Sequence, residues 1–190
     1  MAGLDALPRS AGPDARAARY VEVAERLRLL LDGETDEVAL LSTVVCELHH
    51  AFGAWDWTGF YRVVGDRMLA VGPYQGGHGC LRIPFDRGVC GAAARTRTTQ
   101  CVADVEARAD HIACSSSTRS EIVVPVIDPA GRLWAVLDVD SDDLAAFDAV
   151  DVRGLEAIAT DLAARLSAGS GLDNLPDAGQ GAAPEERHRS

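Results

Sequence analysis

The sequence predicts an α+β fold in which helices at the two ends of the chain cover one antiparallel sheet. Apolar residues recur at helical spacing near both ends, whereas the middle holds β-branched and aromatic segments separated by turn signals. Two pairs of these segments are joined by turns short enough for hairpins, which antiparallel strands use. Helices segregated from such hairpins pack mainly on one face of a sheet. With 190 residues, 47% of them apolar, the chain suits one domain.

Two helices are expected ahead of the sheet. The first begins at Asp14, where apolar side chains take on helical spacing, and the letters DGE end it. The second is expected from Thr35 to Phe52. Residues 1–13 lack this pattern, so we expect a flexible leader there.

The strands are expected to begin with a hairpin. The segment WDWTGFYRV is aromatic and β-branched, RMLAVG is its short partner, and VGD fits the turn between them. CLRIPF follows as a further strand, GVCGAAART as a short helix and TTQCVAD as another strand.

A second hairpin and a helix complete the expected domain. EIVVPVID and RLWAVLDVD are joined by PAG, which is a tight-turn signal, and the amphipathic helix FDAVDVRGLEAIATDLAARLSAG follows. The domain is therefore expected over residues 14–168. Residues 169–190 are rich in Gly, Pro, Ala and charge, and we expect a disordered tail.

Charge and composition exclude several classes of protein. The net charge of -11 argues against a nucleic-acid-binding surface, which needs basic patches. No apolar run is long enough for a signal peptide or a membrane span, so the cytoplasm is the expected location. Five cysteines, an odd number, in a chain without an export signal argue against a structural disulfide framework.

The strand RLWAVLDVD carries two carboxylates on one face. Alternation predicts a core face of apolar side chains and places Asp138 and Asp140 on the other face with Trp134 and Val136. Like charges at this spacing raise each other's pKa. Two interpretations remain: a solvated strand end, or a carboxylate site. No third oxygen ligand follows at calcium-loop spacing and the histidines match no zinc pattern, so no metal is expected. The core face comprises Leu133, Ala135, Leu137 and Val139.

The strand WDWTGFYRV carries an aromatic face. Alternation puts Trp55, Trp57, Tyr61 and Val63 on one side. Such a stripe is either part of the core or, at Trp57 and Tyr61, a wall against which an apolar group packs.

The cysteines fall into two groups. Cys46 and Cys101 stand among apolar neighbours in expected regular elements and are interpreted as small core residues. Cys90 in GVCG is either a core residue or a helix-start thiol of lowered pKa. Cys80 follows a glycine-rich loop, where backbone can approach a ligand, and Cys114 follows His111 by three residues. A reactive role for Cys114 remains open, and a Cys-His hydrolase is a rival that lacks an assigned orienting residue.

Taken together, these segments closely resemble the free methionine-(R)-sulfoxide reductases, a family of GAF-domain enzymes. The resemblance spans residues 18–166 and rests on segments in the same order, with the three cysteine spacings at 80, 90 and 114. These segments are WTGFY, GPYQG, RIP with GVCGAAA, HIAC, SEIVVPV, VLDVDS and FDAVD. It implies a GAF-like fold, a single antiparallel sheet flanked by N- and C-terminal helices.

The resemblance also assigns roles. It implies that Cys114 is the catalytic nucleophile, Cys80 the resolving cysteine and Cys90 an auxiliary resolving cysteine. The carboxylates and aromatic side chains are implied to bind the substrate. These substrate-binding residues are Trp57, Tyr61, Glu121, Asp138 and Asp140.

The implied reaction is the reduction of free L-methionine (R)-sulfoxide to L-methionine through a sulfenic acid and then a disulfide. Thioredoxin or another dithiol would reduce the disulfide, with no bound cofactor, and a homodimer is expected by analogy. The alternative is a non-catalytic GAF domain that senses a small molecule, because the fold alone does not imply catalysis. A structural domain with incidental thiols is a further rival.

Overall fold

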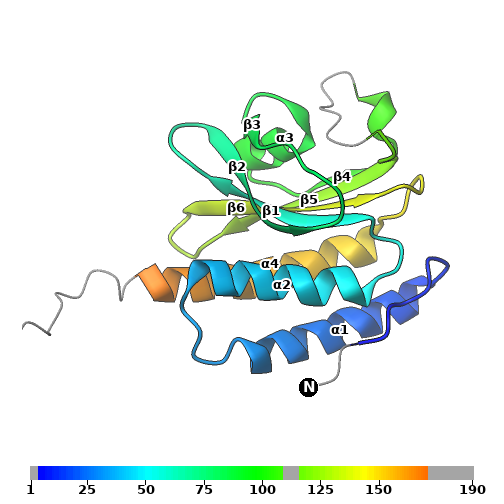
Figure 1. Cartoon of the computed structure of the whole chain (residues 1–190), viewed down its shortest axis with the longest axis horizontal. Helices are drawn as coiled ribbons and strands as arrows, with labels where there is room; N and C mark the ends of the chain where they lie inside the picture. Colours follow the sequence, from blue (N-terminus) through cyan, green and yellow to red (C-terminus); the bar gives the residue numbers. More distant parts are fainter. Residues whose placement is uncertain (1–3, 109–115, 171–190) are drawn as a thin grey trace, which may run out of the picture.

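A six-stranded antiparallel sheet lies at the centre of the molecule, with helices on both sides (Figure 1). The computed structural model describes residues 4–108 and 116–170. The sheet has the strand order β3-β2-β1-β6-β5-β4, with antiparallel pairing between all neighbours, which confirms the predicted α+β class. The strands are β1 (Trp57–Val63), β2 (Met68–Gln75), β3 (Arg82–Pro84), β4 (Gln100–Val102), β5 (Ser120–Ile127) and β6 (Leu133–Ser141).

Three helices lie on one side of the sheet, two of them against it and the third packed beneath those two, and a fourth lies on the other side (Figure 1). The helices against the sheet are α2 (Glu37–Ala51) and α4 (Ala149–Ser170), and α1 (Pro13–Leu30) packs on both of them. On the opposite face lies α3 (Gly88–Thr96), and a short 3₁₀ turn, η1 (Val105–Ala107), follows β4. None of the described helices has the length and apolar character needed to cross a membrane.

The second helix starts slightly later than the sequence pattern predicts. Asp36 rather than Thr35 is the N-cap, and its side chain accepts a hydrogen bond of 2.8 Å from the backbone N–H of Ala39. A carboxylate in this position satisfies an N–H group that the first helical turn leaves unpaired. The helix then continues to Ala51, close to the predicted end.

Each face of the sheet contributes to a separate apolar cluster. On the side of α1, α2 and α4, the core includes Ile122 and Val124 of β5 with Leu137 and Val139 of β6. The alternate residues Val123 and Val136 join the second cluster, on the α3 side. Strand alternation therefore places Asp138 and Asp140 on the α3 side, which confirms the prediction that they share a face opposite that of Leu137 and Val139.

Three aromatic or apolar side chains near strand ends lie on other faces than alternation predicts. The β5–β6 register shifts between Val126 and Ile127, so Leu133 packs in the α3-side cluster and Trp134 against the helix-side core. A bulge of this kind inverts the alternation beyond it. Trp55 precedes β1, and its ring stacks on Phe52 at 4.2 Å in the helix-side core instead of joining Trp57.

The core interpretation of Cys46 and Cys101 is wrong, because both thiols are exposed. Cys46 lies on the outer side of α2, with its Sγ atom 3.9 Å from His50 Nδ1. Cys101 lies on β4, an edge strand that pairs with β5 alone, and only one side of such a strand is covered by the sheet.

The predicted leader contacts the body of the molecule over residues 4–12, which we call the arm. The backbone N–H of Leu7 donates to Ala51 O at 2.9 Å, and Gly53 N donates to Leu7 O at 2.8 Å. Leu4 and Leu7 pack against the helix-side core. No sequence pattern indicates this contact, since it depends on two backbone hydrogen bonds with a distant segment.

Candidate active site

Three carboxylates lie together on the α3 side of the sheet. Glu121 on β5 stands directly opposite Asp140 on β6, and Asp138 stands two residues before Asp140 on the same face. Only 6% of Glu121 and 5% of Asp138 is exposed, and Asp140 is partly buried. Asp138 and Asp140 thus form part of a buried carboxylate site and not a solvated strand end.

Helix α3 adds a thiol to these carboxylates. The Cys90 Sγ atom lies 3.9 Å from Glu121 Oε1, and one ligand atom from each of Cys90, Glu121 and Asp138 lies within 4.8 Å of the others. In the described part of the chain this is the one group of three such residues close enough to hold a metal ion. Our expectation of no metal stays a prediction.

Burial raises the pKa of every acid in this group. Desolvation is the largest cause for Glu121, Asp138, Asp140 and Cys90 alike, and repulsion between neighbouring carboxylates adds to it. Glu121 is raised further by Asp140, and Asp138 by Glu121. The carboxylates therefore keep protons at a pH at which isolated carboxyl groups lose them, and Cys90 is held as a neutral thiol.

One oxygen of this group has no partner. Among the described residues, Asp138 Oδ1 is buried and accepts no hydrogen bond. A buried acceptor without a donor is costly, so a site of this kind favours a ligand that brings an N–H or O–H group.

A wall of stacked aromatic rings stands on β1 and β2, next to the carboxylates. Trp57 pairs with Asp140 across β1 and β6. Its ring centroid lies 5.7 Å from that of Tyr61 and 5.4 Å from that of Tyr74, with interplanar angles of 22° and 17°. Tyr74, in GPYQG, was not singled out from the sequence, and only the neighbouring glycines pointed to its segment.

Glycines let the backbone lie against this wall. A Cβ atom on Gly79 would be 2.8 Å from the Tyr61 hydroxyl oxygen, and one on Gly59 would be 2.5 Å from the Trp57 ring. The indole N–H of Trp57 donates to Gly77 O at 3.0 Å. These contacts fix the glycine-rich segment between β2 and β3 over the rings.

Of Cys80 and Cys114, which are predicted to react with each other, only Cys80 lies within the described residues. Cys80 lies half-buried between β2 and β3, its backbone hydrogen-bonds the Tyr61 hydroxyl, and its thiol is engaged in a disulfide. Cys114 lies outside the described residues, so the expected Cys80–Cys114 pairing stays a prediction.

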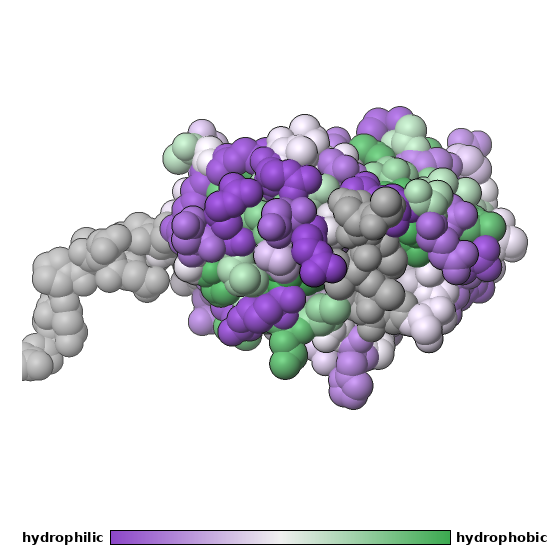
Figure 2. Space-filling model, turned by 90° about the horizontal axis from the view of Figure 1, so that it is seen from above, coloured by the Kyte–Doolittle hydropathy of each residue, from purple (hydrophilic) through white to green (hydrophobic). Residues whose placement is uncertain are grey.

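Viewed from above, toward the α3 side, the surface is largely hydrophilic, with scattered apolar side chains (Figure 2).

Comparison with known proteins places the chain in a family. The GAF domain family matches residues 36–166. The crystal structure of free methionine-R-sulfoxide reductase from Neisseria meningitidis, in complex with its substrate, is 45% identical with a TM-score of 0.80. That similarity covers 89% of this chain and 99% of the other. The chain belongs to the free methionine-R-sulfoxide reductase family of GAF-domain proteins.

Curated relatives agree with this membership. Free methionine-R-sulfoxide reductase from Saccharomyces cerevisiae is 40% identical, over 73% of this chain and 82% of the relative. The protein of the same name from Escherichia coli is 35% identical, over 75% of this chain and 86% of the relative. The suspected family, the GAF-like fold and the expectation of an oxidoreductase are confirmed.

Proposed function

We propose that this protein reduces free L-methionine (R)-sulfoxide to L-methionine with its own thiols as reductant. One observation carries the proposal: a buried carboxylate group that retains protons stands beside an aromatic wall in a chain of this family. A sulfoxide needs a nucleophile at sulfur and a proton at oxygen, and a free amino acid adds an ammonium group to be recognised.

The carboxylates divide these tasks. Glu121 and Asp140 face each other and share a proton, which they direct to the sulfoxide oxygen. The unpaired Asp138 Oδ1 accepts a hydrogen bond from the substrate ammonium. The aromatic wall of Trp57 and Tyr61 packs against the methyl end of the substrate.

The thiols complete the reaction. The Cys114 thiolate attacks the sulfoxide sulfur, the oxygen is protonated, and methionine leaves as Cys114 becomes a sulfenic acid. Cys80 then attacks the sulfenic sulfur, which releases water and forms a disulfide. A dithiol such as thioredoxin, in the cytoplasm, reduces that disulfide by exchange and becomes oxidised itself.

Cys90 takes an auxiliary part in this scheme. It is buried beside Glu121 and Asp138, and its raised pKa makes it a poor thiolate at neutral pH. We therefore assign resolution mainly to Cys80, and resolution by Cys90 to conditions in which Cys80 is missing.

We also propose a homodimer formed through the helices. Val21, Leu29 and Leu30 on α1 are apolar and exposed, at 59%, 57% and 41%. Light scattering after size-exclusion chromatography measures the mass in solution, and a monomer at all concentrations would refute this part.

The function is tested by incubating the protein with free methionine sulfoxide and a dithiol and measuring methionine. The R and S epimers are assayed separately, because the handedness rests on the family resemblance. Turnover of R with little turnover of S is expected. Binding without turnover of either epimer would favour the rival, a GAF sensor that catalyses nothing.

A further inference from the structure

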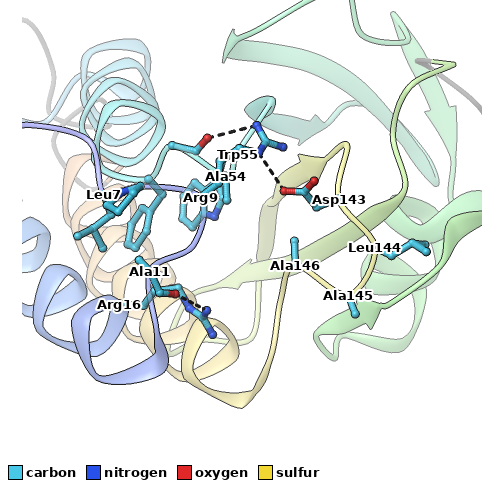
Figure 3. Close-up of a pocket in the computed structure, with 13 residues that line it drawn as sticks. Leu7, Arg9, Ala11, Arg16, Ala54, Trp55, Asp143, Leu144, Ala145 and Ala146 are labelled. Carbon is cyan, nitrogen blue, oxygen red and sulfur yellow. Dashed lines mark hydrogen bonds and ion pairs between the residues drawn. The ribbon is translucent and has the colours of Figure 1, made fainter.

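Arg9, in the arm, binds the carboxylate that immediately precedes the aromatic wall. Its Nη1 and Nη2 atoms donate to the two oxygens of Asp56 at 3.0 and 2.8 Å. Its Nε atom donates to Asp143 at 2.9 Å, and Nη1 also approaches Gly53 O at 3.3 Å. Figure 3 shows the Arg9 side chain reaching from the arm to Asp143.

Asp56 links Arg9 to the ends of two strands of the site through hydrogen bonds with their backbone. Its carboxylate accepts the backbone N–H of Asp142 at 2.8 Å, just beyond the end of β6. Its own N–H donates to the carbonyl oxygen of Asp140 at 2.9 Å. Trp57 follows Asp56 in the chain and pairs with Asp140. The arginine therefore holds together the two backbone segments that carry Trp57 and Asp140.

The ion pair between Arg9 and Asp56 is better suited to orienting the two side chains than to stabilising the fold. The side chains of Arg9 and Asp56 are 43% and 32% exposed, and ion pairs that solvent reaches so easily contribute little to folding. Two parallel N–H···O bonds nevertheless fix the angle between guanidinium and carboxylate, which a lysine cannot do. The arginine also lowers the pKa of Asp56, so the carboxylate stays charged and keeps accepting the Asp142 N–H.

The pocket beside Arg9 is poorly suited to binding an anion. It has a volume of about 240 Å³ and lies between the arm and the segment that follows β6 (Figure 3). Its two arginines are already paired with carboxylates, Arg9 with Asp56 and Asp143, and Arg16 with Asp148. Neither offers a free positive charge to an anion.

We propose that Arg9 is a positioning residue, which through Asp56 fixes the ends of β1 and β6 and so the placement of Trp57 and Asp140. The inference rests on the proposed function, since it assigns the arm to the same substrate site. It makes the arm part of the working enzyme, although no arm residue touches the carboxylates of the site among the contacts described.

The first experiment compares Arg9→Gln and Arg9→Lys with the parent in steady-state reduction of free methionine sulfoxide. Arg9→Gln should lower kcat/KM about ten- to a hundredfold, because small displacements of positioned groups cost this much. Arg9→Lys keeps the charge but loses the paired geometry, so it should not restore the parent value. Asp56→Asn should give a similar loss, and Arg9→Gln/Asp56→Asn should lose no more than either single variant.

The matched control is Arg165→Gln. Arg165 also joins a carboxylate and a backbone carbonyl, those of Asp161 and Leu31, but at the far end of α1. A loss of kcat/KM equal to that of Arg9→Gln would overturn the proposal, because it would show a general effect of losing an arginine. If Arg9→Gln does not fold, Arg9→Lys and Asp56→Asn carry the same comparison.

Amide hydrogen exchange tests the positioning without any substrate. In Arg9→Gln the Asp56 and Asp142 amides should exchange at least about tenfold faster than in the parent, while Arg165→Gln leaves them unchanged. Unchanged exchange, or faster exchange with a parent-like kcat/KM, would overturn the inference. A parent that does not reduce methionine sulfoxide but shows the exchange effect would refute the proposed function and leave the positioning contact demonstrated.

Discussion

Glu121 and Asp140 stand directly opposite each other on β5 and β6, on the face of the sheet that α3 covers. Two carboxylates in this relation cannot both ionise at low cost, and burial raises the pKa of each. In the proposed function this pair is the proton donor, in a chain whose net charge is -11.

Glu121→Gln should change how stability depends on pH. The folded parent holds a proton at Glu121 above the ordinary carboxyl pKa, whereas the unfolded chain has lost it there. The parent therefore loses stability as pH rises from that ordinary value through the raised one, and the glutamine does not. Urea unfolding at about pH 4 and pH 8 measures the free energy of unfolding. That of the variant, relative to the parent, should be higher at pH 8 than at pH 4. The control, Asp66→Asn in the exposed β1–β2 turn, should show a constant difference.

Asp140→Asn should act on the chemical step. An amide cannot share a proton with Glu121, so kcat should fall by about a hundredfold, while KM changes less. In the parent, kcat should decline as pH rises through the raised pKa of the pair, because the donor is then lost. An asparagine variant with parent-like kcat would show that Asp140 does not take part in proton delivery.

Asp138→Asn should act on substrate binding. Its Oδ1 atom accepts no hydrogen bond in the described structure, and a charged hydrogen bond to ammonium is worth roughly 1.5–3 kcal/mol, or about ten- to a hundredfold in affinity. The parent should also reduce N-acetylmethionine sulfoxide poorly, as measured by kcat/KM. Equal kcat/KM for the free and acetylated substrates would show that the site does not recognise the substrate ammonium.

Cys114→Ser should abolish turnover. A hydroxyl group is a far weaker nucleophile than a thiolate at neutral pH, and the proposed function assigns the attack to this cysteine in HIAC. Methionine formation in the presence of dithiol measures the effect. Residual activity within a few-fold of the parent would reject Cys114 as the nucleophile.

Once the disulfide at Cys80 has been reduced and the reductant removed, substrate should join Cys80 to Cys114. Peptide mapping identifies the bridge, and alkylation before digestion should label Cys46 and Cys101 rapidly and Cys90 slowly, since only Cys90 of these three is buried. A main bridge that contains Cys90 would give that thiol the resolving role. If Cys80 is the main resolving thiol, Cys80→Ala should slow the second turnover and leave the first intact.

Most of the fold was predictable because its signals are local. The hairpin turns, the alternation of β6 and the periodicity of the long helices all lie within short stretches of sequence. The errors fall where a local pattern meets a long-range constraint. The register shift at Ile127 reverses Leu133 and Trp134, and the edge position of β4 exposes Cys101.

The candidate site was predictable in its residues but not in its electrostatics. The shared face of Asp138 and Asp140 follows from alternation alone. The position of Glu121 opposite Asp140, and of Cys90 above both strands, depends on sheet register and on the packing of α3. Tyr74 joins the wall only because β2 lies beside β1.

By itself, the sequence determined the fold class, the order of the elements, the family and the residue types that can reduce a sulfoxide. Each of these depends on neighbours along the chain or on motifs quoted in order. The tertiary structure decided which acids are buried, which thiol is shielded and where the arm is held. Burial and a hydrogen bond such as that between Arg9 and Asp56 join residues far apart in sequence, so no local pattern encodes them.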